Sequence, residues 1–214
     1  ILDRTSYPHA TAVHRMRRPG ANLFVVLVGL LLMIGCIRET ATHAEPAASA
    51  PQLRDMAGTP LDTTAAVHVL LFVRADCPIS NRYAPVVREL VQEFTQSNVQ
   101  FTLVYPNPKI TNQEMEQHRG EFDYPCQTWH DPNHKLVKLA GATITPEAAV
   151  FDARKVLTYC GRIDDRITGF GTQRAKPTKH DLNVAIQKAL RGEGGSCVRT
   201  EAVGCYIGDL NVAN

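Results

Sequence analysis

One cysteine lies where a predicted strand passes into a predicted helix, and this position favours thiol chemistry. Cys77 follows an apolar run and precedes Pro78, which suits the first turn of a helix because that turn needs no N–H at this position. The unpaired N–H groups and the dipole of a helix start favour a thiolate, the reactive form of cysteine. The sequence therefore predicts a nucleophile at Cys77, and the alternative is an inert cysteine in the core.

Three neighbours of Cys77 are candidates for tuning its thiolate. The hydroxyl of Ser80 could donate a hydrogen bond to it. The carboxylate of Asp76 tends to raise a thiol pKa, whereas the cation of Arg74 would lower it if its side chain turned inward. The sequence does not decide between these opposing charges.

A thiolate that attacks a disulfide or a peroxide needs a second thiol to resolve the product. The candidate resolving residues are Cys205, Cys126, Cys160 and Cys197. Cys205 lies in a tail that could swing to the site, and Cys126 precedes a predicted short helix. Alternatively, Cys126–Cys205 and Cys160–Cys197 are structural disulfides. Four cysteines allow three pairings, and the sequence does not choose among them.

Length and charge limit the classes of protein that need be considered. The chain has 214 residues and a net charge of +2, from 23 basic and 21 acidic side chains. This length suits one domain with appendages. The near-neutral charge gives no sign of nucleic-acid binding, which needs a concentrated basic face.

The amino-terminal region has the features of an export signal. A basic start at residues 16–18 precedes an apolar run over 23–34. This run is shorter than the roughly 20 residues that a membrane-spanning helix needs. Residues Leu32–Cys36, at the end of this run, resemble a bacterial lipobox, which implies lipidation of Cys36. The alternative is an uncleaved anchor or an ordinary signal peptide.

These features divide the chain into four segments: residues 1–36 with the signal, a flexible tether over 37–51, a folded domain over 52–192, and a cysteine-containing tail over 193–214. We expect an exported lipoprotein of the cell envelope, facing the periplasm or the extracellular side. Its lipid anchor would make the membrane a partner.

Strands and helices alternate along the folded segment. Apolar runs and helical spacing predict strands over 67–73, 99–105, 148–151 and 156–159, and helices over 86–94, 111–122, 132–140 and 178–190. Cap signals support the helices: Thr111 with Glu114, Asp131 before Pro132, Thr178 with Asp181, and Gly141 as a stop. The order indicates an α/β fold, a mixed sheet with an antiparallel edge flanked by helices.

The spacing of Cys77 and two prolines resembles the thioredoxin-like superfamily. Pro85 matches that family's helix proline, and Thr145-Pro146 matches its cis-proline loop. Asp131-Pro132 and the Tyr159–Asp165 segment are similar to the redoxin branch, which includes alkyl hydroperoxide reductase and thiol-specific antioxidant proteins. The resemblance covers residues 52–192. It implies a thioredoxin-like fold in which Pro146 packs against Cys77, shapes the docking surface and keeps metal from the thiol.

Several positions depart from the family pattern. Ser80 replaces the second cysteine of the Cys-x-x-Cys motif, and Leu71 replaces the buried acid. Because of Ser80, the ordinary disulfide within the motif cannot form. Asp76 stands in place of the usual Trp, and Arg74 stands where peroxiredoxins have Thr.

The resulting hypothesis is an exported thiol–disulfide oxidoreductase that uses Cys77 on a protein disulfide or dithiol. The alternatives are a peroxiredoxin-type thiol peroxidase and a non-catalytic redoxin-fold binding module. No organic cofactor is implied. No metal site is expected either, because Asn81 leaves the motif of Sco-type copper chaperones incomplete and His130 and His134 are predicted to be surface residues.

Overall fold

The computed structural model describes residues 64–208. The predicted signal, Cys36 and the tether lie outside this range. Among the helices of residues 64–208, none is long and apolar enough to cross a membrane.

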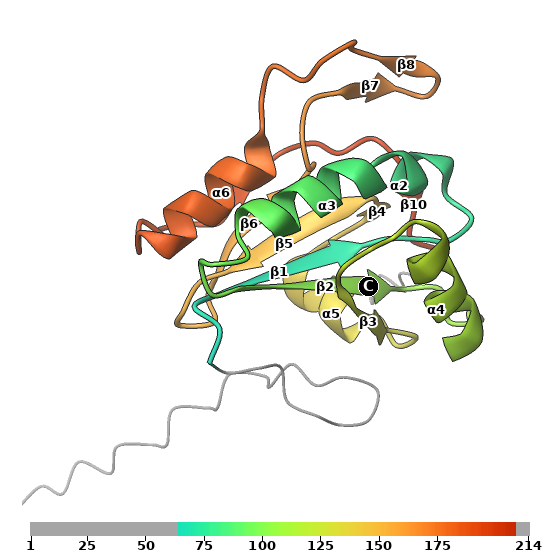
Figure 1. The fold of residues 1–214 in the computed structure, drawn as a ribbon, viewed down its shortest axis with the longest axis horizontal. Coiled ribbons are helices and arrows are strands. Elements are labelled where there is room, and N and C mark those ends of the chain that lie inside the picture. Colours follow the sequence, from blue (N-terminus) through green and yellow to red (C-terminus); the bar gives the residue numbers. More distant parts are fainter. Residues whose placement is uncertain (1–63, 209–214) are drawn as a thin grey trace, which may run out of the picture. The chain divides into compact units, whose positions relative to one another are not determined.

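The core of the fold is a six-stranded mixed sheet (Figure 1). In spatial order its strands are β3 (Gln127–His130), β2 (Val99–Tyr105), β1 (Val67–Phe72), β5 (Glu147–Phe151), β6 (Leu157–Gly161) and β9 (Val198–Arg199). The strands β1, β2 and β3 are parallel, and β5 runs antiparallel to both β1 and β6. This arrangement confirms the predicted α/β fold with a central mixed sheet.

The central strand β1 is buried along its whole length. Its side chains alternate between two cores, with Val69 and Leu71 in the main cluster and Leu70 and Phe72 in a second cluster on the opposite face. A strand covered on both faces must be apolar at every position that meets a core, which explains the continuous run in the sequence.

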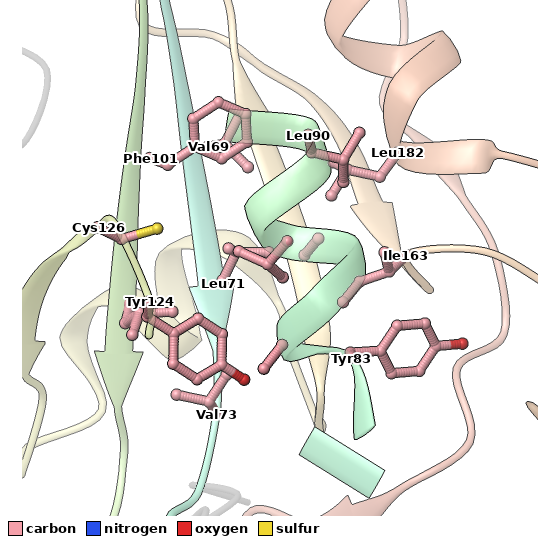
Figure 2. Packing of buried hydrophobic residues seen from close by; sticks show 14 of the residues in the cluster. Val69, Leu71, Val73, Tyr83, Leu90, Phe101, Tyr124, Cys126, Ile163 and Leu182 are labelled. Carbon is pink, nitrogen blue, oxygen red and sulfur yellow. The ribbon is translucent and has the colours of Figure 1, made fainter. Parts of the chain in front are cut away.

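Helices cover both faces of the sheet. They are α2 (Pro78–Arg82), α3 (Ala84–Glu93), α4 (Asn112–Glu121), α5 (Lys135–Ala140) and α6 (Asp181–Leu190). The main cluster holds Leu90 of α3 and Leu182 of α6 (Figure 2), whereas Val137 of α5 packs in the second cluster. The layers are therefore α3 and α6 on one side of the sheet and α5 on the other (Figure 1).

The predicted cap of α4 is confirmed. The Thr111 side chain accepts a hydrogen bond from the Glu114 backbone, and the Glu114 carboxylate accepts one from the Thr111 backbone. The predicted stop of α5 is also present, because Gly141 follows it with a φ of 67°.

Two other helix starts differ from the prediction. The helix α5 begins at Lys135 instead of Pro132, since the Asp131 carboxylate caps the N–H groups of Lys135, Leu136 and Val137 from farther upstream. Thr178 does not cap α6; its N–H and hydroxyl bind the Asp165 carboxylate instead.

Four short strands lie outside the main sheet. They form two pairs: β4 (Ile144–Thr145) with β10 (Cys205–Tyr206), and β7 (Ile167–Gly169) with β8 (Thr172–Gln173). Sequence patterns missed all four, as well as β3 and β9, because two to four residues are too few to show a periodicity.

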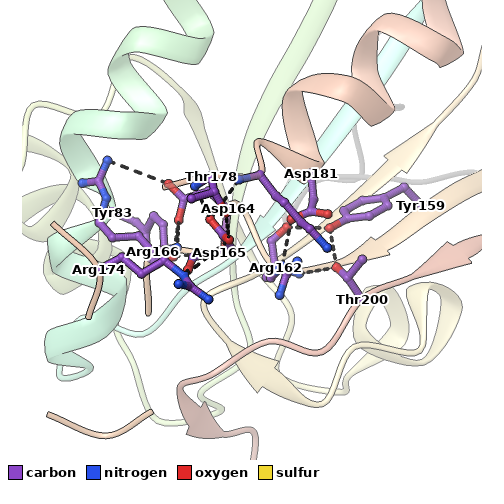
Figure 3. A network of polar contacts seen from close by, with 11 residues as sticks. Tyr83, Tyr159, Arg162, Asp164, Asp165, Arg166, Arg174, Thr178, Asp181 and Thr200 are labelled. Atoms are coloured by element: carbon purple, nitrogen blue, oxygen red, sulfur yellow. Dashed lines mark hydrogen bonds and ion pairs between the residues drawn. The ribbon is translucent and has the colours of Figure 1, made fainter. Parts of the chain in front are cut away.

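The tail is part of the domain through residue 208. Its strand β9 runs parallel to β6, and Thr200 is bound by the Arg162 N–H and the Tyr159 hydroxyl (Figure 3). The approach is close at Gly161, where an added Cβ would lie 2.2 Å from the Thr200 hydroxyl oxygen. Residues of the tail therefore contact the domain in this structure.

Candidate active site

The turn after β1 places Cys77 at the start of α2. Cys77 is the N-cap residue with extended backbone (φ −95°, ψ 108°), and Pro78 occupies the first turn as predicted. Hydrogen bonding from the N–H groups of Ile79 and Ser80 lowers the pKa of the Cys77 thiol. The Cys77 side chain is nevertheless 0% exposed.

The loop before β5 lies against this cysteine. The Thr145–Pro146 peptide bond is cis, as the family resemblance implied. The Cys77 sulfur lies 3.3 Å from the Thr145 carbonyl oxygen, to which the protonated thiol donates. The structure thus brings Cys77 to the loop that holds Pro146.

A second cysteine reaches the same place from the tail. Cys205 in β10 pairs with Thr145 in β4, and the Thr145 hydroxyl donates to the Cys205 carbonyl at 3.3 Å. The thiols of Cys205 and Cys77 are close enough for each to shift the pKa of the other, and both are free. Among residues 64–208, Cys205 is the one candidate resolving thiol among the main causes of the pKa shift of Cys77.

The two thiols have opposite shifts in pKa. Burial works to raise the pKa of Cys77, but hydrogen bonds from Cys205, Ser80 and Ile79 outweigh it and lower this pKa. Burial, the hydrogen bond to Cys77 and the charge of its thiolate together raise the pKa of Cys205 to about 11. Cys77 is therefore the member of the pair that ionises first.

Ser80 takes the position of the missing motif cysteine as a hydrogen-bond donor. It is fully buried, and both its backbone N–H and its hydroxyl lower the pKa of Cys77. The Ser80 carbonyl accepts from the Tyr124 hydroxyl at 3.1 Å, which fixes this turn of α2.

Arg74 and Asp76 form an ion pair beside the two thiols. The Arg74 guanidinium binds both oxygens of the Asp76 carboxylate, at 2.9 and 2.7 Å, and this bond lowers the pKa of Asp76. Arg74 also donates to the Tyr206 carbonyl at 3.4 Å. The opposing charges of Arg74 and Asp76 thus compensate each other. The Arg74 cation is close enough to Cys205 to lower its pKa.

The other cysteines occupy apolar surroundings. Cys126 packs in the main core near Tyr124 (Figure 2), and burial raises its pKa to about 12. Cys160 lies in the second core, where burial and the nearby Glu147 carboxylate also raise its pKa to about 12. Cys197 is half-buried in the tail. The raised pKa values of Cys126 and Cys160 disfavour the thiolate that a resolving cysteine needs.

A buried histidine beneath the site escaped the sequence analysis. His118 donates through Nε2 to Asn81 Oδ1 at 2.9 Å and accepts the Tyr105 hydroxyl at Nδ1, at 2.7 Å. Asn81 in turn donates to the Ala75 carbonyl at 3.1 Å. This chain holds the turn that precedes Cys77. Its only sequence signal is the spacing of His118 three residues after the buried Met115.

The histidines near α5 differ from the prediction of surface residues. His134 is buried, and its Nε2 binds the Pro106 carbonyl at 2.9 Å. The half-buried His130 binds the Asn107 carbonyl at the same distance. Both hold the loop after β2. Within the described part of the chain, no three His, Cys, Asp or Glu side chains are grouped so that they could hold a metal ion.

Comparison with known sequences decides the family. A sequence profile described as "AhpC/TSA family" matches residues 46–160, more than half of the chain. The chain belongs to the AhpC/TSA family. This result agrees with the resemblance to the redoxin branch inferred from Asp131-Pro132 and the Tyr159–Asp165 segment. No curated protein matches this AhpC/TSA-family chain significantly.

Solved structures share the fold. An uncharacterized conserved protein from Geobacillus kaustophilus has a TM-score of 0.59 at 21% identity, covering 73% of this chain and 86% of its own. A hypothetical protein from Sinorhizobium meliloti has a TM-score of 0.60 at 20% identity, with 73% and 88% covered. A Neisseria meningitidis protein described as a thioredoxin reaches 0.50 at 16% identity, with 65% and 87% covered. These similarities establish the thioredoxin-like fold.

Proposed function

We propose that this AhpC/TSA-family protein is a thiol–disulfide oxidoreductase whose redox couple is Cys77 and Cys205. The observation that carries the proposal is the placement of both cysteines against Thr145, where β10 pairs with β4; the pKa shifts of the two thiols in opposite directions support it. In the thioredoxin pattern the second cysteine of the Cys-x-x-Cys motif lies in the helix. In this proposal the second cysteine comes from the tail instead.

The first step is attack by the Cys77 thiolate on a partner's disulfide. A bond forms between the Cys77 sulfur and one partner sulfur, the partner's S–S bond breaks, and its second sulfur leaves as a thiolate. Donors at Ile79 and Ser80 keep Cys77 ionised for this attack. In the proposed role Pro146 holds the docking surface beside the sulfur.

The second step is attack by Cys205 on the Cys77 sulfur of the mixed disulfide. Once Cys77 is bonded to the partner, it carries no negative charge, so two of the causes that raise the pKa of Cys205 disappear. The cation of Arg74 remains and favours the Cys205 thiolate. The Cys77–Cys205 bond forms, the bond between Cys77 and the partner breaks, and the second partner sulfur leaves as a thiolate. The cysteine pair is then oxidised, and the partner has been reduced by two electrons.

The surroundings of β10 favour a polypeptide as the partner. A cleft of about 610 Å³ is lined by Gly204 and Tyr206, the two neighbours of Cys205 in the chain, and by Ile144 and Cys160; neither Cys77 nor Cys205 is part of its lining. The strongly exposed rings of Phe170 and Tyr206 border it. An exposed apolar rim suits a protein chain better than a small hydrophilic molecule.

Peptide mapping after controlled oxidation tests the proposal. The reduced protein is mixed with glutathione disulfide, quenched with acid, alkylated and digested. We expect a Cys77–Cys205 disulfide to form, and we expect catalysed reduction of a model protein disulfide with dithiothreitol as the donor. Formation of a different cysteine pair, with Cys77 left fully alkylated, would contradict the proposal.

Family membership favours a peroxidase as the second candidate function. Hydrogen peroxide would then convert the Cys77 thiolate to a sulfenic acid with release of hydroxide, and Cys205 would displace water to give the same disulfide. The relative rates of Cys77–Cys205 disulfide formation with hydrogen peroxide and with a protein disulfide separate the two functions.

We also propose that the protein is exported and anchored through lipid on Cys36. The support is the sequence of the amino-terminal segment, which lies outside the described residues. Mass spectrometry of the mature amino terminus, and fractionation of a Cys36→Ala variant, test this. Recovery of wild-type protein from the membrane fraction and of the variant from the soluble fraction is the expected result.

A further inference from the structure

The nucleophile is inaccessible in the arrangement described above. The Cys77 side chain has no exposed surface. A thiolate that attacks a disulfide must meet its target sulfur opposite the bond that breaks, and this approach needs open space. Given the proposed function, some part of the protein must therefore move before Cys77 reacts.

The strand β10 is the neighbour of Cys77 that is held least firmly. It has two residues and pairs only with the equally short β4, whereas β1 lies at the centre of the sheet. The Tyr206 side chain is 75% exposed. Segments with few buried contacts open at the lowest cost in free energy, so β10 detaches more readily than the fully buried strand β1.

Residues 203–207 are the segment we call the cover. Its polar contacts are the Ile207 N–H to the Thr143 carbonyl at 2.9 Å, the Thr145 hydroxyl to the Cys205 carbonyl at 3.3 Å, and Arg74 to the Tyr206 carbonyl at 3.4 Å. The side chain of Ile207 is buried in the second core cluster. These contacts define one closed position.

A glycine allows the cover to lie this close to β4. A Cβ added to Gly204 would lie 2.1 Å from the Thr145 carbonyl oxygen and 2.7 Å from its carbon. Both atoms are backbone, so neither can rotate away as a flexible side chain would. Any side chain at position 204 must push the cover off β4.

We propose that the cover leaves β4 to admit a partner's disulfide to Cys77, and that its return delivers the resolving thiol. Attack on the partner takes place with the cover open, since Cys77 is then exposed. Closure brings the Cys205 sulfur back to Cys77, where it forms the Cys77–Cys205 bond and expels the partner thiolate. One movement thus controls both entry of the substrate and completion of the reaction.

The variant Gly204→Ala tests the cover without altering either cysteine. The measured quantity is the rate at which N-ethylmaleimide labels Cys77 in the reduced full-length protein, followed by peptide mass spectrometry across a pH series. The plateau at high pH reports access, and the midpoint reports the pKa. We expect the plateau rate to rise about tenfold, because the added methyl group overpacks the closed state. We also expect the midpoint to move to higher pH as the hydrogen bond from Cys205 is lost.

Gly208→Ala is the matched control, because an added Cβ there meets no atom within 4 Å. Its plateau rate should stay within about twofold of wild type, as for a substitution at an open surface position. Ile207→Ala loosens the other end of the cover and should also raise the plateau, so the test does not depend on one variant folding. Amide hydrogen exchange at position 207 reports whether the cover has left.

Unchanged labelling of Cys77 in a variant whose residue 207 amide has lost its protection would overturn the proposal. Unchanged labelling in both Gly204→Ala and Ile207→Ala would do the same. The proposed function is tested separately by disulfide reduction. If the variants label faster at Cys77 but wild type reduces no disulfide, the movement of the cover is supported and the oxidoreductase function is rejected. If wild type reduces disulfides but labelling is unchanged in the variants, the function is supported and the movement is rejected.

Discussion

Three buried cysteines of this protein have very different chemistry. The side chains of Cys77, Cys126 and Cys160 are 0%, 6% and 1% exposed. The pKa of Cys77 nevertheless lies below its usual value, while burial raises the pKa of each of the other two thiols to about 12. Burial therefore does not decide whether a cysteine of this protein is reactive.

The difference lies in the hydrogen-bond donors around each sulfur. Cys77 receives the N–H groups of Ile79 and Ser80 and the Cys205 thiol, all of which stabilise negative charge. Cys160 instead lies 3.6 Å from a carboxylate oxygen of Glu147, which opposes ionisation. The first N–H groups of a helix have no partner within the helix and can therefore bind a thiolate. The N–H groups of a central strand are already bonded to the neighbouring strands.

The largest expected effect comes from the nucleophile itself. Cys77→Ser should lower disulfide reduction by about a thousandfold or more, the scale seen when a nucleophile is removed. Cys126→Ala is the matched buried control and should retain activity within about threefold. The measurement is turnover of a model protein disulfide with dithiothreitol. Rates no higher than the uncatalysed background for both wild type and Cys77→Ser would instead favour a non-catalytic binding module.

Loss of the resolving thiol should separate the two steps. Cys205→Ser should lose turnover by about a hundredfold or more but still react once, since the nucleophile remains. A stable mixed disulfide through Cys77 should then be recovered by non-reducing electrophoresis and mass spectrometry. If Cys160→Ala trapped the intermediate and Cys205→Ser did not, the assignment of the redox couple would be wrong.

A smaller effect is expected at Ser80. Ser80→Ala removes the hydroxyl donor but keeps the backbone N–H, so it should slow Cys77 alkylation at pH 7 by about tenfold. Because the lost bond lowers the pKa of Cys77, the pH–rate profile should move to higher pH. Ser196→Ala, at an exposed position, should leave the profile in place. An unshifted Ser80→Ala profile would remove the hydroxyl from the set of stabilising donors.

The smallest effect concerns stability at alkaline pH. A thiol whose pKa is raised on folding contributes stability that is full below its unfolded pKa, near 9, and is lost as the pH rises toward about 12. Wild type should therefore lose about 1 kcal/mol for each of Cys126 and Cys160 between pH 9 and 10. Urea denaturation should show a flatter pH dependence in the Cys126→Ala/Cys160→Ala double variant. Parallel curves for the two proteins would mean that these thiols ionise normally in the fold.

Local signals made much of the framework predictable. The capping box of Thr111 and Glu114 and the stop at Gly141 act within one turn, and the uniform apolarity of β1 reports burial on both faces. Cys77 was predictable as a candidate for the same reason, because its strand and helix adjoin it in sequence.

The partner of Cys77 was not predictable, since it depends on contacts between distant segments. Cys205 was one of four open candidates, and its selection follows from the register of β10 on β4, sixty residues away at Thr145. His134 was mistaken for a surface residue because its burial arises from the loop at Pro106. The pairing of β10 with β4 and the contact of His134 with Pro106 each join segments that are far apart in the chain. Neither contact leaves a periodic pattern in the sequence.

We expect the short strand β9 to protect the edge of β6 from pairing with other copies of the chain. It lies at the outer margin of the main sheet, next to β6. Open strand margins offer free N–H and C=O groups to other chains and promote aggregation. A chain cut before residue 197 would lose Cys205, the second thiol of the proposed redox couple, and would also leave the edge of β6 unpaired. The proposed oxidoreductase activity and the solubility should therefore decline together.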